Sequence, residues 1–180
     1  MHERVISPTD YPDVQGPLIF LNGPIQGAED WQSKAIEIIQ GLDLQGSIII
    51  ANPRREYMTG HFVYTEQVRW ERFYRQRARD NGVNMFWLAK EIEHDPTRSF
   101  AQTTRFELAE SLGWYLNRGH KHPSKMFIGI EKGFIGANYI EYVVSHDYSE
   151  EGGEIIPIFN DNLEYTCQMA VEEILERRDE

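Results

Sequence analysis

The chain has 180 residues, 41% of them hydrophobic, and this length suits one globular domain with a sizeable core. Its 29 acidic residues outnumber its 18 basic residues, and the net charge of -11 disfavours nucleic acid polymers and anionic membranes as partners. It has one cysteine, no apolar signal core at its amino terminus, and no apolar run near the roughly 20 residues of a membrane span. We expect a cytoplasmic protein with one domain over residues 1–180, in which residues 1–17 form an amino-terminal extension.

Short apolar segments alternate with longer amphipathic segments along the chain. The first apolar segment leads through a Gly- and Pro-rich turn to a helical pattern. The second apolar segment is expected to end before Pro53, because proline has no N–H group to donate to a sheet ladder. We expect strands at residues 18–22, 47–51, 83–91, 125–131 and 154–159. We expect helices at residues 30–40 and 65–82, around Glu107, and at residues 137–146 and 163–178.

This alternation predicts an α/β fold with three layers, a five-stranded parallel sheet carrying helices on both faces. In such sheets the ligand crevice lies beyond the carboxyl ends of the strands. The stretches expected to line it are NGPIQG, NPRREY, LAKEIEHDPTRSF, EKGFIG and TTRFE.

Glu107 lies near the start of its expected helix, on the side opposite to the apolar face. One interpretation is a solvated glutamate, favoured near a helix amino terminus by the helix dipole. The other is a nucleophile for a sugar carbon, which the same dipole and nearby amides would keep ionised. Its position at the expected crevice favours the nucleophile.

The NGPIQG loop has glycines that leave backbone amides open to a ligand, although the loop also fits a simple tight turn. It lacks the lysine and the spacing of a Walker loop and is not G-x-G-x-x-G, so no NTP or dinucleotide site is expected. Arg54 and Arg55 suit either an anionic ligand or partners within the protein. The histidines show no metal-binding spacing and no serine lies in G-x-S-x-G, so neither a metal site nor a serine triad is expected.

In the long helix, Gln67, Trp70, Glu71 and Tyr74 recur at three- and four-residue intervals. This pattern fits a base-recognition face, or ordinary core packing for Trp70. Trp87 presents the same choice between core packing and stacking on a planar ligand. A solvated basic side of this helix is expected from Arg69, Arg72, Arg75, Arg77 and Arg79.

Six stretches in this order resemble the nucleoside 2-deoxyribosyltransferase-like family: IFLNGPIQG…W, NPRR, QVRWE, MFWLAKE, TTRFELAESLGW and NYIEYV. The resemblance spans residues 19–144. It implies a flavodoxin-like (Rossmann-like) fold, a nucleoside or nucleoside 5′-monophosphate substrate, no cofactor, and a homo-oligomer.

By this resemblance Glu107 is the nucleophile that attacks the anomeric carbon, and a second base or water then attacks the deoxyribosyl-enzyme ester. If Arg54 and Arg55 face the crevice, a monophosphate is favoured over a free nucleoside. The substrate-binding residues expected around Glu107 are Asn22, Gly23, Pro24, Ile25, Asn52, Arg54, Arg55, Gln67, Trp70, Glu71, Trp87, Thr103 and Thr104.

The chain departs from the family pattern at two places. Family members carry an aspartate shortly before the glutamate, where this chain reads SFAQTTRFE, and a tyrosine near the first strand, where it has Asn22. The alternatives for the missing acid are Asp95, Glu91 or Glu93, or hydrogen bonds alone from the two threonines before Glu107.

We therefore expect cleavage of an N-glycosidic bond, by a transferase or a hydrolase. Two alternatives stay open: a nucleotide-binding sensor with this fold and no turnover, and an interaction protein with Trp31, Trp114 and Tyr115 as partner contacts.

Overall fold

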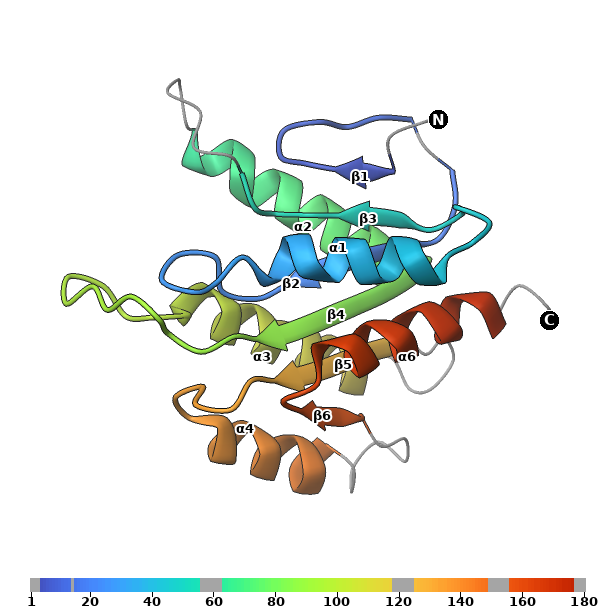
Figure 1. Ribbon diagram of the computed structural model, residues 1–180. Helices are drawn as coiled ribbons and strands as arrows, with labels where there is room; N and C mark the ends of the chain where they lie inside the picture. Colours follow the sequence, from blue (N-terminus) through green and yellow to red (C-terminus); the bar gives the residue numbers. More distant parts are fainter. Residues whose placement is uncertain (1–3, 14, 56–62, 118–124, 149–155, 177–180) are drawn as a thin grey trace.

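A six-stranded, all-parallel sheet forms the middle layer of the computed structural model, which describes residues 4–13, 15–55, 63–117, 125–148 and 156–176 (Figure 1). The strand order is β1-β3-β2-β4-β5-β6, a Rossmann- and flavodoxin-like arrangement. The strands are β1 (Val5–Ile6), β2 (Leu18–Asn22), β3 (Ile49–Ala51), β4 (Gly82–Leu88), β5 (Lys125–Ile130) and β6 (Ile158–Asn160).

The expected number of five strands is wrong because β1 lies inside the supposed amino-terminal extension. It pairs in parallel with β3, with Val5 opposite Ile50. Two apolar residues are too few to form a periodic pattern, so only pairing with β3 reveals this strand. The other five strands overlap the expected segments.

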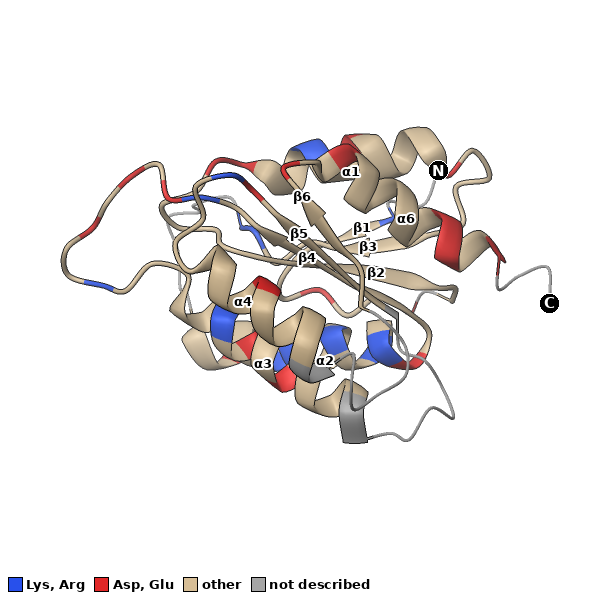
Figure 2. Ribbon diagram, turned by 90° about the horizontal axis from the view of Figure 1, so that it is seen from below, with Lys and Arg blue, Asp and Glu red and all other residues tan. Residues whose placement is uncertain are grey.

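Five α-helices in the described ranges cover the two faces of the sheet (Figure 2). One face carries α1 (Trp31–Leu42) and α6 (Leu163–Glu176), and the other carries α2 (Tyr64–Asp80), α3 (Gln102–Asn117) and α4 (Ala137–Val143). A π-helical turn, Val144–Tyr148, continues α4. No described helix is long and apolar enough to cross a membrane.

Alternation along β2 divides the core between the two faces. Ile19 and Leu21 pack with Trp31 of α1, whereas Leu18 and Phe20 pack with Trp70 of α2. Trp31 is only 2% exposed, so it belongs to the core and is not a free partner contact. Asn22 shares the side of Phe20 because strand residues alternate between faces, and it therefore faces the layer of α2 and α3.

The amino-terminal segment is fastened to α2. The Asp10 carbonyl accepts hydrogen bonds from Trp70 Nε1 at 2.9 Å and from the Tyr74 hydroxyl at 3.2 Å. The Tyr11 ring stacks on Tyr74 with the ring centroids 6.0 Å apart. The segment before β2 thus completes both an edge of the sheet and the packing of α2.

Candidate functional site

The carboxyl ends of β2 and β4 mark the point where the strand order reverses. β2 pairs with β3 on one side and with β4 on the other, which is where parallel α/β sheets bind ligands. The loops after β2 and β4 meet there, because the Gly27 carbonyl accepts hydrogen bonds from the amides of Ile92 and Glu93. The two stretches expected at the crevice therefore lie together.

Gly23 and Pro24 form a tightly packed turn at the end of β2. A Cβ atom on Gly23 would lie 2.3 Å from the Trp87 carbonyl oxygen and 2.5 Å from the Trp31 ring, so only glycine fits. The Pro24 carbonyl accepts a 2.8 Å hydrogen bond from Trp31 Nε1. This hydrogen bond fixes the turn to the first residue of α1.

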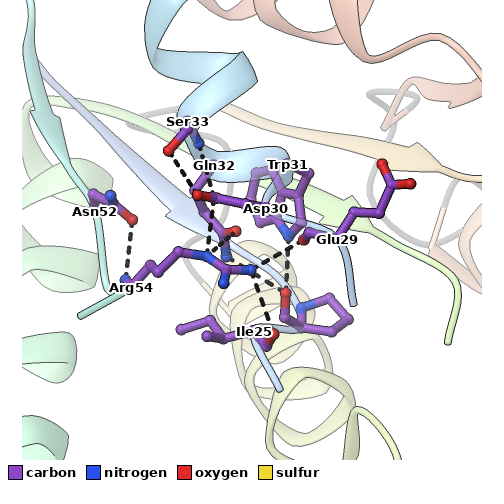
Figure 3. Close-up of polar contacts among 9 residues, drawn as sticks. Ile25, Glu29, Asp30, Trp31, Gln32, Ser33, Asn52 and Arg54 are labelled. Carbon is purple, nitrogen blue, oxygen red and sulfur yellow. Dashed lines mark hydrogen bonds and ion pairs between the residues drawn. The ribbon is translucent and has the colours of Figure 1, made fainter. Parts of the chain in front are cut away.

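Arg54 points into this loop (Figure 3). Its Nε donates to Gln32 Oε1 at 2.9 Å and lies 3.0 Å from Asp30 Oδ1. Its Nη2 donates to the carbonyls of Glu29 and Ile25. Of the two interpretations of Arg54, the structure supports partners within the protein.

Asn52 supports the same arrangement, since its Oδ1 accepts a 3.0 Å hydrogen bond from the Arg54 amide (Figure 3). Asn52, Ile25 and Arg54 therefore belong to one network that fixes the loop after β2 to the start of α1 and the end of β3.

Glu107 lies in the second turn of α3 and points toward α2. Its side chain is 13% exposed, and its Oε1 is 3.9 Å from Nη1 of the buried Arg75. The interpretation as a solvated glutamate is therefore wrong. Arg75, 3% exposed, is likewise not part of a solvated basic side.

The electrostatic surroundings of Glu107 differ from the expectation of a carboxylate kept ionised by the helix dipole. Burial raises the pKa of Glu107 to about 7, Arg75 acts to lower it, and the carboxyl groups of Glu71 and Glu110 raise it further. Desolvation is the largest of these effects. A group with this pKa interconverts between its acid and its ionised form near neutral pH.

Three more of the expected residues, Arg55, Gln67 and Glu71, form a hydrogen-bonded group that reaches Glu107 through Glu71. Gln67 Nε2 donates to Glu71 Oε1 at 2.6 Å and to the Pro53 carbonyl at 3.1 Å, and Gln67 Oε1 accepts from Arg55 Nε. Burial raises the pKa of Glu71, against the opposing effects of Gln67, Arg75 and Arg55. We call this group, with Glu107 and Arg75, the α2–α3 seam.

Asn22 faces the α2–α3 seam from the end of β2. It is 1% exposed; its Nδ2 donates to Asn84 Oδ1, and its Oδ1 accepts no hydrogen bond from the described residues. Asn84 Nδ2 donates in turn to the Arg75 carbonyl at 3.1 Å. The two asparagines connect β2 and β4 to the helix that carries Arg75 and Glu71.

Trp70 and Trp87 lie in the core, which corrects their expected role in stacking on a base. Trp70 is fully buried against Phe20 and Tyr74. Trp87 is 5% exposed and packs with the side chains beneath α1 and α6, on the face opposite to the α2–α3 seam. Neither indole has a free face for a planar ligand.

The two threonines before Glu107 differ in position, because Thr103 is exposed and Thr104 is 4% exposed. Asp95 accepts hydrogen bonds from the side chain and amide of Thr97, which lower its pKa and keep it ionised. Asp95 is therefore poorly suited to hold a proton for a leaving group. Glu71 is better suited to it, because burial raises its pKa.

Sequence reasoning missed Arg75, Asn84 and Glu110. Arg75 and Glu71 are four residues apart and lie on the same side of α2. The sequence does not reveal that α3 covers this side of the helix. Within the described ranges, no group of three or more His, Cys, Asp or Glu side chains could hold a metal ion. No protein-family model matches the chain, and no curated protein matches it either.

Proposed function

We propose that the protein cleaves the N-glycosidic bond of nucleosides, with Glu107 as the nucleophile. The observation that carries the proposal is the buried Glu107 carboxyl group beside Arg75 and Glu71, with a pKa of about 7, on the helix that follows β4. The family resemblance of the sequence supports the same chemistry.

In the proposed reaction, a carboxylate oxygen of Glu107 bonds to the anomeric carbon while the bond from that carbon to the base nitrogen breaks. The departing base takes the electron pair of this bond and a proton. Glu71 supplies the proton in our proposal, because burial raises its pKa and favours the protonated form. Water or a second base then attacks the anomeric carbon, the bond from this carbon to Glu107 breaks, and the attacking group gives its proton to Glu71, which completes hydrolysis or transfer.

A free nucleoside is our preferred substrate. The condition for a 5′-monophosphate was that Arg54 and Arg55 face the crevice, but Arg54 is engaged by Gln32, Asp30 and two loop carbonyls. A phosphate would have to compete with these contacts. Deoxyribose and ribose are both open as the sugar, and the homo-oligomer stays a prediction.

The test is incubation of the protein with a panel of nucleosides and 5′-monophosphates, with and without adenine or cytosine as acceptor. Free base and exchanged nucleoside are measured by chromatography. Glu107→Gln is expected to lower base release at least 100-fold, on the order of what loss of a nucleophile costs. Glu37→Gln, which changes an exposed glutamate of α1 on the opposite face, is the matched control and should keep activity.

Base release by Glu107→Gln at the rate of the unaltered protein would refute the role of Glu107. Binding of a nucleotide in calorimetry without release of base by the unaltered protein would instead support the sensor.

A further inference from the structure

We propose that Arg75, anchored by Glu110, is the positioning residue for Glu107: it holds a positive charge beside the carboxylate without hydrogen-bonding to it. The role of Arg75 in catalysis rests on the proposed function. Its effect on the charge of Glu107 depends only on the side chains of Arg75, Glu107 and Glu110.

The geometry of Arg75 is asymmetric. Its Nη2 donates to Glu110 Oε2 at 2.9 Å, a hydrogen bond between opposite charges, whereas its Nη1 stays 3.9 Å from Glu107 Oε1. The second distance is too long for a hydrogen bond but short enough for strong Coulomb attraction in a buried place. Glu110 thus takes the close contact and Glu107 keeps the distant one.

The α3 helix presents these partners on one side. Glu107, Glu110 and Trp114 follow at intervals of three and four residues, which brings them to the same face of the helix. The Trp114 ring lies 5.9 Å from the Arg75 guanidinium carbon and adds a cation–π contact. Arg75 is held at its far end by Glu110 and Trp114, with its backbone carbonyl bound by Asn84.

Arg75 has unused hydrogen-bonding capacity, and part of it, on Nη1, lies toward Glu107. Arg75 is 3% exposed, and its Nε and Nη1 have no hydrogen-bond partner among the described residues. Buried donors without partners are costly, so they persist in a folded protein for a reason. Because Nη1 makes no hydrogen bond to the described residues, its charge acts on Glu107 through space at 3.9 Å.

The distance between Arg75 Nη1 and Glu107 Oε1 has a chemical consequence. A carboxylate bound to arginine through two hydrogen bonds has its lone pairs engaged and is a poor nucleophile. At 3.9 Å, the guanidinium favours the ionised form of Glu107 while both carboxylate oxygens stay free to attack. Glu110 maintains this distance by holding Arg75 back.

We expect the variants Arg75→Met and Glu110→Gln to shift the pKa of Glu107 in opposite directions. Arg75→Met removes the favourable charge and should raise the pKa of Glu107 by about one unit or more, given typical effects of an opposite charge at this range. Glu110→Gln removes a negative charge and releases Arg75 toward Glu107, so it should lower the pKa. The remaining titratable neighbour, Glu71, is unchanged in both variants.

The experiment is a carbon-13 NMR titration of protein labelled at the glutamate side-chain carboxyl carbon, in which the Glu107 signal is identified by its absence in Glu107→Gln. Arg72→Met, which removes an exposed arginine from the same helix, is the matched control and should leave the titration in place. Arg75→Lys should recover part of the effect because it restores the charge. If Arg75→Met does not fold, Glu110→Gln alone still tests the direction.

The same shifts should appear in activity as the acidic limb of the pH profile of kcat/KM. If the pKa rises by about one unit from about 7, the ionised fraction at pH 7 falls from about one half to about one tenth, so kcat/KM should fall about five-fold.

The titration needs no substrate, which separates the two proposals. An unmoved or lowered Glu107 pKa in Arg75→Met, or a raised one in Glu110→Gln, overturns the positioning role whatever the activity. The expected shifts in a protein that releases no base would leave the positioning role standing and refute the proposed function.

Discussion

Glu107→Gln is expected to make the folded protein more stable above neutral pH, in addition to abolishing its proposed activity. In the unfolded chain the carboxyl group of Glu107 loses its proton near pH 4.5, whereas in the folded protein it does so near pH 7. Between these values the folded state binds more protons than the unfolded state, so the free energy of unfolding falls as pH rises through this range. Glutamine keeps the shape of the protonated acid and has no proton to lose.

The magnitude follows from the pKa difference of about 2.5 between 4.5 and about 7, at about 1.4 kcal/mol for each unit. The ionisation of Glu107 then lowers the free energy of unfolding by about 1 kcal/mol at pH 5 and by about 3 kcal/mol at pH 8, relative to the protonated form. The stabilisation by Glu107→Gln should therefore increase by about 2 kcal/mol from pH 5 to pH 8.

Urea unfolding of both proteins at pH 5, 6, 7 and 8, followed by circular dichroism, measures this difference. Glu71 and the other titrating groups are present in both proteins, so the comparison isolates Glu107 and its coupling to Glu71. Equal pH dependence in the two proteins would mean that Glu107 titrates normally in the folded state, and the proposed site would lose its electrostatic basis.

Two further predictions concern the loop after β2. Gly23→Ala should lower the free energy of unfolding by about 1 to 3 kcal/mol, because its Cβ would lie 2.3 Å from the Trp87 carbonyl oxygen; an unchanged urea midpoint would contradict this packing. Arg54→Met should lower stability and turnover of nucleosides and monophosphates alike, because its contacts are internal; a selective rise in KM for monophosphates would show instead that Arg54 binds phosphate.

The fold class was predictable because apolar and amphipathic segments alternate so regularly. Strand β4 also illustrates the limit of such patterns, since all seven of its residues are buried and both faces carry helices. For that reason Trp87 could not be assigned to the core or to a ligand from the sequence. β1 escaped prediction because its two residues acquire their structure from pairing with β3.

The site was predictable only as separate pieces. The helix expected around Glu107 is present as α3, which follows β4. Its burial depends on α2, which lies far away in the sequence, and nothing in the spacing of arginines on α2 distinguishes the buried Arg75 from the exposed Arg72. Contacts between distant segments, such as Arg75 with Glu110, need the tertiary structure.

The hydrogen bonds from Trp70 and Tyr74 to the Asp10 carbonyl connect residues 4–13 to the part of α2 that carries the proposed site. Deleting residues 4–13 would leave two buried donors, on Trp70 and Tyr74, without their acceptor. These residues directly precede Glu71 and Arg75 in α2. Weak turnover in a shortened chain would then reflect a loosened helix and not a missing reactive group. Fusion partners are for the same reason better attached after α6.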